Sequence, residues 1–211
     1  MSEKELSKTR ESERFKYFPD LKLAVRNRNL APLTIVKRQE PKDAQDFFTL
    51  IKGKEIKTSI LVHKRFAITQ LDSHLRMILP KKCISSNFYK KWVEDMANIC
   101  VLFSDITKTK EIIFWLSSTR VCKNFHIDKT DFRLLVTYSG AGTEWISTPM
   151  LHLENMENLS KDTIYRLKTW NIALFNSCKD GIVHRSPQVK ENSWSLLMRL
   201  DSSNFKKMKK A

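Results

Sequence analysis

Two short segments of the chain contain the residues best suited to chemistry. The segment "FHIDK" places His126 and Asp128 two positions apart, and the later segment "GIVHRSP" contains His184. In an extended strand, residues i and i+2 point to the same face, so His126 and Asp128 could bind one ion while Ile127 points the other way. Two imidazoles and one carboxylate form the facial triad of non-haem Fe(II) oxygenases, and zinc accepts the same donors. We therefore predict a metal site at His126, Asp128 and His184.

Each of these residues also has an ordinary structural explanation. A His-x-Asp pair arises often by chance. His184 could be a core histidine bonded to a backbone carbonyl, or an anion contact beside Arg185 and Ser186. Cys122 lies four residues before His126, and its apolar context predicts an inert buried thiol. The metal hypothesis depends on the three candidate ligands taken together.

Three further polar residues are candidates for catalysis. Arg133 and Tyr138 lie in "FRLLVTY", the next predicted strand, and Arg199 lies in the last predicted strand. An arginine can pair with a carboxylate through two parallel hydrogen bonds, so Arg133 or Arg199 could anchor an organic acid, with a slight preference for Arg133. Arg133 could equally brace Asp128 or Glu144. Glu144 itself is expected to be an exposed residue at a strand end.

The apolar pattern divides the chain into a helical half and a strand half. Between about residues 43 and 107, apolar residues recur at helical spacing, which predicts a short helix after Asp43 and longer helices over 65–79 and about 86–105. From residue 111 to about 201, short runs of β-branched and aromatic residues alternate with glycine and proline breaks. Six or more short strands there favour an antiparallel barrel or a two-sheet sandwich.

Length and composition are typical of one globular domain. We expect a mobile arm over residues 1–18, a single α+β domain over 19–201 and a basic tail over 202–211 of the 211-residue chain. The segment 150–163 reads as an irregular loop. No apolar run reaches the roughly 18 residues that would span a bilayer, and four widely spaced cysteines suggest reduced thiols. We expect a soluble cytoplasmic protein without a membrane partner.

The charge of the chain invites a nucleic-acid partner. The formal net charge is +15, and clustered Lys and Arg attract phosphate through a long-range force. The basic residues are spread along the chain, however, without a stripe interleaved with exposed aromatic residues. A solvated basic surface is therefore the simpler interpretation, and no motif supports nucleic-acid binding.

The segments around the candidate ligands resemble one family. The runs "CKNFHIDKTDFRLLVTYSGAGTEW", "GIVHRSP" and "LLMRLD" are similar to the pattern of an uncharacterised bacterial family, named only as domain of unknown function 1826. The resemblance is specific over about residues 122–201 and extends more weakly back to about residue 20. It implicates Cys122, Phe125, His126, Asp128, Arg133, Thr137, Tyr138, Gly140, Gly142, Thr143, Glu144, Trp145, His184, Arg185, Ser186 and Pro187.

The chain departs from the family pattern where an acid could be anchored. Trp194 and Ser195 stand where the family has arginines, so an acid anchor would fall to Arg199 or Arg133. Lys123 and Ala141 replace prolines, which affects the stiffness of the turns more than the chemistry.

More remotely, the order of the motifs is similar to that of double-stranded β-helix oxygenases. This resemblance implies an antiparallel double-stranded β-helix barrel of the cupin or jelly-roll kind, with the helical half packed on it. It also implies Fe(II), with zinc as the alternative ion, and 2-oxoglutarate held by Arg133 or Arg199. Three hypotheses follow: an Fe(II)- and 2-oxoglutarate-dependent oxygenase of unknown substrate, a non-enzymatic zinc- or iron-binding module linked to metal homeostasis, and a basic nucleic-acid-binding module.

Overall fold

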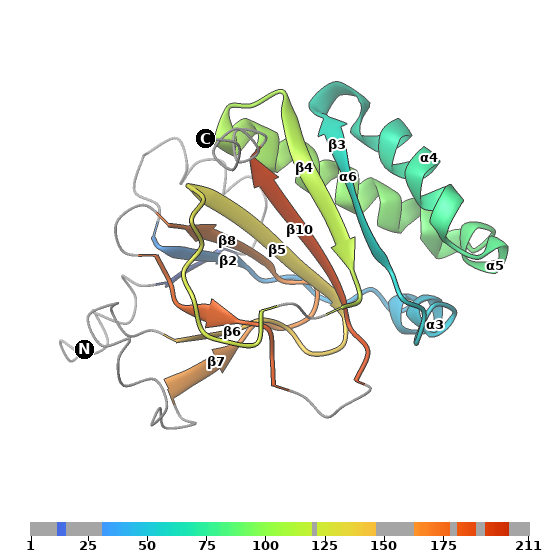
Figure 1. Cartoon of the computed structure of the whole chain (residues 1–211). Coiled ribbons are helices and arrows are strands. Elements are labelled where there is room, and N and C mark those ends of the chain that lie inside the picture. Colours follow the sequence, from blue (N-terminus) through green and yellow to red (C-terminus); the bar gives the residue numbers. More distant parts are fainter. Residues whose placement is uncertain are drawn as a thin grey trace.

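The strands in the described part of the chain form two sheets (Figure 1). The computed structural model describes residues 12–15, 31–119, 122–146, 163–177, 181–188 and 193–202. The large sheet contains, in spatial order, β1 (Ser12–Phe15), β2 (Leu33–Val36), β8 (Ile172–Asn176), β5 (Phe132–Ser139), β10 (Leu196–Ser202), β4 (Glu111–Ser117) and β3 (Lys57–His63). The small sheet contains β7 (Ile164–Arg166), β6 (Glu144–Ile146) and β9 (His184–Arg185). All neighbouring strands are antiparallel except β1 and β2.

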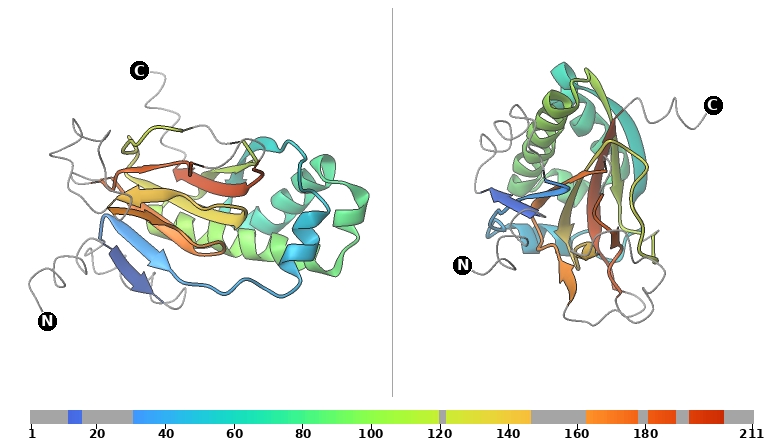
Figure 2. Two further views of the ribbon diagram at one scale, coloured as in Figure 1. Left: turned by 90° about the horizontal axis from the view of Figure 1, so that it is seen from below. Right: turned by 90° about the vertical axis from the view of Figure 1, so that its left-hand side faces the viewer.

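Helices cover one face of the large sheet (Figure 2). They are α3 (Ala44–Thr49), the 3-10 helix η1 (Lys64–Phe66), α4 (Ala67–Ile78), α5 (Lys81–Ile84) and α6 (Asn87–Thr107). Helix α6 begins where the Ser86 hydroxyl accepts a hydrogen bond from the Tyr89 backbone N–H, and it ends at Lys108 in the left-handed conformation. None of the described helices is long and apolar enough to cross a membrane.

The pleat of the large sheet separates two cores. Successive residues of a strand point to opposite faces, so Leu134 and Val136 of β5 pack against α6 residues such as Trp92 in the larger core. Leu135 points the other way and joins a smaller core with Trp145 of the small sheet. The large sheet therefore presents one face to the helices and the other face to the small sheet.

The predicted elements are largely confirmed. The helices expected after Asp43, over 65–79 and over 86–105 are α3, α4 and α6. The six predicted strand segments correspond to β4, β5, β6, β8, β9 and β10. The antiparallel α+β class is also confirmed. The described strands form two separate sheets without defining a closed barrel, so the double-stranded β-helix is not established.

Two predictions along the chain need correction. The range 43–107 is not purely helical, because β3 lies inside it and pairs with β4 along its whole length at the edge of the large sheet. The range 1–18 contains β1, whose backbone pairs with β2. Residues 147–162 and 203–211, which hold almost all of the expected loop and tail, lie outside the described part of the chain.

Replacement of Leu134 tests the larger core. Leu134 is fully buried between the sheet and the helices, so Leu134→Ala should lower the free energy of unfolding by roughly 2–5 kcal/mol. Leu61→Ala is the matched control, because Leu61 is 44% exposed and its loss should cost under about 1 kcal/mol. Urea denaturation of both variants measures the difference. Equal losses in the two variants would contradict this assignment of the faces.

Candidate metal centre

Backbone pairing brings the two candidate histidines side by side. The backbone N–H of His126 donates to the carbonyl of His184 over 3.0 Å, and the N–H of His184 donates back over 2.9 Å. This antiparallel bridge places the segment around His126 next to β9, on the side opposite β6. Directly opposed residues of an antiparallel pair point to the same face, and the two ring centres lie 4.6 Å apart.

Each imidazole uses one nitrogen for the backbone and turns the other towards Asp128. His126 Nδ1 lies 3.0 Å from the carbonyl oxygen of Asn124, and His184 Nδ1 lies 3.0 Å from that of Ile182. A carbonyl can only accept, so both Nδ1 atoms carry hydrogen and both Nε2 atoms of the neutral rings carry a lone pair. This arrangement is typical of histidines that bind a metal through Nε2.

The carboxylate of Asp128 completes the cluster. Asp128 Oδ2 lies 3.3 Å from His184 Nε2, and Oδ1 lies 3.8 Å from His126 Nε2. One ligand atom from each residue can be chosen so that all three lie within 4.8 Å of one another. Oδ2 is buried without a hydrogen-bond partner among the described residues. Because two lone pairs face each other across 3.3 Å, a cation between them would satisfy both, and the donor set fits a divalent metal ion.

A chain of ion pairs supports this carboxylate. Arg133 donates through Nη1 to Asp128 Oδ1 and through Nε to Asp201 Oδ1, the latter over 2.7 Å. Asp201 is fully buried, and Arg199 Nε lies 3.0 Å from its other oxygen. Of the two roles expected for Arg133, the structure therefore supports the brace of Asp128, since two of its three nitrogens already contact aspartates.

These contacts keep Asp128 ionised. Burial raises the pKa of the Asp128 carboxyl, but the neighbouring His184, Arg133 and His126 together lower it more. The resulting pKa lies below the ordinary value for aspartate. The carboxylate is consequently available as a ligand at neutral pH, which metal binding requires.

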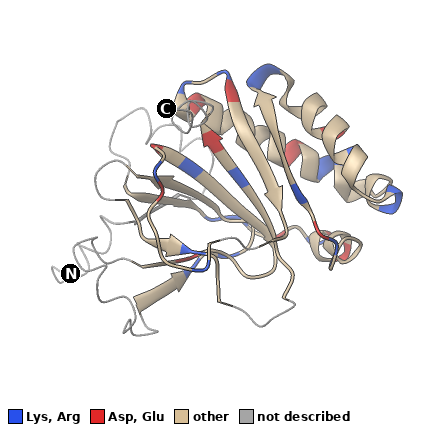
Figure 3. Ribbon diagram, viewed as in Figure 1, with Lys and Arg blue, Asp and Glu red and all other residues tan. Residues whose placement is uncertain are grey.

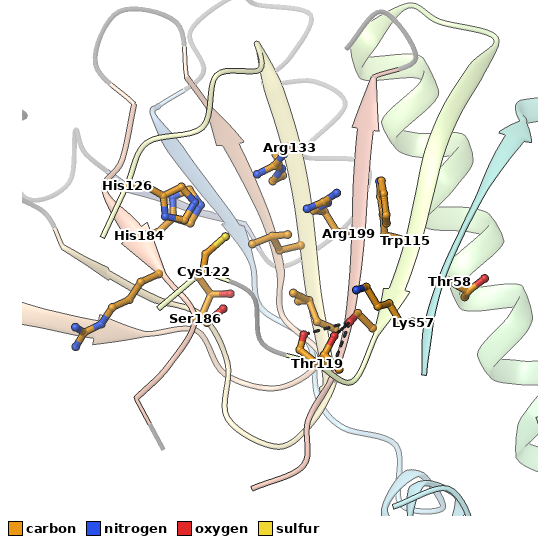
Figure 4. Close-up of a pocket in the computed structure, with 15 residues that line it drawn as sticks. Lys57, Thr58, Trp115, Thr119, Cys122, His126, Arg133, His184, Ser186 and Arg199 are labelled. Carbon is orange, nitrogen blue, oxygen red and sulfur yellow. Dashed lines mark hydrogen bonds between the residues drawn. The ribbon is translucent and has the colours of Figure 1, made fainter. Parts of the chain in front are cut away.

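A cavity of about 320 Å³ opens beside the three candidate ligands. His126, His184 and the two candidate arginines all line it (Figure 4). Trp115, Leu135 and Leu197 provide apolar parts of its wall. The described residues of the wall include no aspartate or glutamate, so the cavity favours an anionic ligand.

Arg199 reaches into this cavity with its terminal nitrogens uncommitted (Figure 4). Its guanidinium carbon lies 4.5 Å from the ring centre of Trp115, which supports the group from one side. Asp201 holds the Nε end. The terminal nitrogens of Arg199 donate no hydrogen bond to any described residue, so these donors are available to a carboxylate.

The structure corrects the expectation for Tyr138. Tyr138 shares a strand face with Leu134 and Val136, because strand residues alternate between faces. Its side chain is fully buried on the helix side, where the hydroxyl donates to Asp95 Oδ2 over 2.8 Å. Burial, followed by the nearby Asp95 charge, raises the pKa of Tyr138 well above its ordinary value. Tyr138 therefore lies outside the cavity, and its predicted catalytic role is wrong.

Two residues near the site differ from the sequence-based expectation, and a third was not predicted. Cys122 is exposed and lines the cavity instead of being buried. Glu144 is buried, and it accepts hydrogen bonds from Arg166 over 2.6 Å and from Arg185 over 2.8 Å. Asp201 was not foreseen, although its spacing of two from Arg199 in "RLD" is the signal that places both residues on one strand face.

Acid titration should reveal the role of Glu144. Burial raises the pKa of Glu144, but the hydrogen bonds from Arg166 and Arg185 lower it more, so the pKa lies below its ordinary value of 4.5. Its stabilisation is complete above that ordinary value and is lost as the pH falls through the lower folded-state pKa. Glu144→Gln should lower the free energy of unfolding by roughly 1–2 kcal/mol at pH 7.

Urea denaturation over a pH series tests this expectation. The difference between the wild type and Glu144→Gln should shrink steadily below pH 4.5. Glu111→Gln on the exposed start of β4 is the control and should change little at any pH. A difference that stays constant into acid would show that the ion pairs do not stabilise the fold.

Solved structures of oxygenases are among those similar to this chain. They include an oxidoreductase of the 2OG-Fe(II) oxygenase family from Burkholderia pseudomallei, with 10% identity, coverage of 90% of this chain and 94% of that chain, and a TM-score of 0.42. The Fe(II)/α-ketoglutarate-dependent dioxygenase TqaL has 9% identity, coverage of 87% and 85%, and a TM-score of 0.45. A prolyl-4-hydroxylase from Pseudomonas putida has 9% identity, coverage of 86% and 98%, and a TM-score of 0.40. TM-scores below 0.5 do not establish a common fold.

The sequence itself gives a clear family assignment. A comparison with curated proteins finds no match. Residues 21–201 match the model of a family described as "Protein of unknown function (DUF1826)". This range includes all three candidate metal ligands and both candidate arginines, in agreement with the resemblance in the motifs. The chain belongs to the DUF1826 family.

Proposed function

We propose that this protein is a mononuclear metal enzyme, an Fe(II)- and 2-oxoglutarate-dependent oxygenase of unknown substrate. The observation that carries the proposal is the convergence of two imidazole Nε2 atoms and the unpartnered Oδ2 of Asp128 beside a cavity. His126, His184 and Asp128 would hold the ion. Three ligands of this kind leave other coordination positions open for substrate and oxidant.

The chain supplies binding, orientation and protection around the ion. The chemistry that ferrous iron brings to such a site is the activation of dioxygen. The side chains of Asp128 and His184 are only 3% and 5% exposed, whereas that of His126 is 33% exposed. Burial of two of the three ligands limits the approach of bulk water, which protects reactive species.

Arg199 is the residue best placed to anchor 2-oxoglutarate. Its uncommitted nitrogens face the cavity, and Trp115 and Asp201 restrain the rest of its side chain. On β10, Asp201 pairs with Arg133, and Arg199 precedes Asp201 by two residues. Two residues of a strand span about 7 Å, so a short dicarboxylic acid could contact both the ion and Arg199. Arg133 then acts as the brace of Asp128.

A zinc- or iron-binding module without catalysis is the second candidate. The same three donors suit zinc, and the metal site alone does not distinguish the two ions. The adjoining cavity favours the enzyme, because a storage or structural site has no need of an uncommitted arginine beside the ion. A nucleic-acid module gains no support from the structure, since Figure 3 shows lysines and arginines scattered over several elements.

Titration with ferrous ion tests the metal site. Under anaerobic conditions, the wild type should bind one equivalent of Fe(II), and His184→Ala should bind it at least about 100-fold more weakly, because a direct ligand is lost. His74→Ala is the control, since His74 lies on α4 and contacts Thr58. Circular dichroism checks that both variants fold. Equal Fe(II) affinity in wild type and His184→Ala would refute the proposed ligand set.

Consumption of 2-oxoglutarate tests the reaction. The wild type with Fe(II), oxygen and ascorbate as the reductant should convert 2-oxoglutarate to succinate and carbon dioxide, even slowly without a substrate. Arg199→Met should raise the dissociation constant for 2-oxoglutarate by at least about 30-fold, as expected when one partner of a partly buried charge pair is lost. Arg65→Met, on the exposed η1, should not change it. Stoichiometric metal without any turnover or binding of 2-oxoglutarate would favour the non-enzymatic module.

A further inference from the structure

Lys57 lines the same cavity as the candidate metal centre, and no described residue provides it with a counter-charge. It is the first residue of β3, and its exposed side chain forms no ion pair with the described residues. In Figure 4, Lys57 lies beside Thr119 at the end of the cavity away from His126 and His184. A lysine in this position is an available binding group for an anion.

The register of the large sheet places Lys57 beyond Arg199. Lys57 pairs with Ser117 of β4, and Ser117 pairs with Leu197 of β10. Along β10, Arg199 and then Asp201 follow at intervals of two residues, or about 7 Å each. Lys57 is thus level with Leu197, and the distance along the strands from this level to Asp201 is roughly 14 Å. A cosubstrate held between the ion and Arg199 would stop short of Lys57.

The charges around the cavity leave one positive charge at Lys57. Four cations line the cavity: Lys57, Arg133, Arg185 and Arg199. Three anions pair with the arginines, because Asp128 and Asp201 contact Arg133, Asp201 also contacts Arg199, and Glu144 contacts Arg185. A divalent ion and a dicarboxylate cancel each other, so the site with both bound would retain a single positive charge. One carboxylate on the substrate would balance it. A doubly charged phosphate would exceed it.

Two hydroxyl groups accompany Lys57. Ser117 Oγ donates to the carbonyl of Thr119 over 3.1 Å, and it accepts from the Thr119 backbone N–H over 3.1 Å. The Thr119 hydroxyl lies 2.9 Å from Ser117 Oγ, and its hydrogen can rotate towards a ligand. The apolar side chains of Trp115 and Leu197 lie between this polar end and the metal centre along the sheet.

We propose that Lys57, assisted by Thr119, binds the carboxylate of the primary substrate, which is a small organic acid with an apolar body. This inference rests on the proposed function, because the charge balance includes the ion and the cosubstrate. The volume of about 320 Å³ is at the small end for ligand sites, so the cavity suits a small molecule. The apolar body would lie along Trp115 and Leu197, with its reacting carbon directed towards the metal centre.

Matched acids and amides test this proposal. The full chain is loaded with Mn(II) and 2-oxoglutarate without oxygen, so that nothing turns over. Thermal unfolding is then measured with propionate, hexanoate and 3-phenylpropionate, and with the primary amide of each. At least one acid should raise the midpoint more than its amide does. Titration calorimetry should show at least about tenfold weaker binding of that acid to Lys57→Met, because a hydrogen bond to a charged group is lost.

Two controls separate the possible outcomes. Lys52→Met, on an exposed turn, should keep the preference for the acid, and Lys57→Met should bind 2-oxoglutarate as the wild type does. No preference for any acid, a preference that survives in Lys57→Met, or a loss of 2-oxoglutarate binding in Lys57→Met would each overturn the inference. If Mn(II) and 2-oxoglutarate fail to stabilise the wild type, the proposed function fails first and this inference falls with it.

Discussion

An ionised carboxylate almost out of contact with water is the constraint on which this site depends. Asp128 can stay charged in such a place only if positive groups surround it, and removal of one partner from a buried ion pair typically costs 3–5 kcal/mol. Arg133 satisfies one oxygen of Asp128, while the other oxygen faces the lone pair of His184. The gap at that second oxygen is what a bound cation would fill.

One face of the large sheet packs against the helices in the main core, and the opposite face carries the candidate site. The face of β5 and β10 that bears Leu134 and Tyr138 packs against helices, and it can be rigid because it holds no part of the site. The opposite face bears Arg133, Arg199 and Asp201, which form a continuous set of charged contacts ending at Asp128. Strand β9 of the small sheet supplies His184, and the segment bridged to it supplies His126. Since Arg133 and Arg199 share Asp201, a ligand at Arg199 and an ion at Asp128 act on one connected network.

Local motifs were sufficient to predict that His126, Asp128 and His184 come together, but not which groups the arginines contact. The step of two between His126 and Asp128 defines a common strand face, and the helical spacing of apolar residues predicted α6 closely. Whether Arg133 anchors an organic acid or braces Asp128 depended on its contact with Asp201, a partner 68 residues away. Tyr138 lies five residues after Arg133, so strand alternation places it on the opposite face, among the core residues. The edge strand β3 was missed because its partner β4 lies about fifty residues further along.

Anomalous diffraction from crystals grown with Mn(II) under anaerobic conditions would test the central claim most directly. We predict one strong peak about 2.0–2.2 Å from the Nε2 atoms of His126 and His184 and from an oxygen of Asp128. A peak elsewhere, or coordination that omits His184, would contradict it. So would a structure in which Asp128 is satisfied by a doubly protonated His184 with no ion bound.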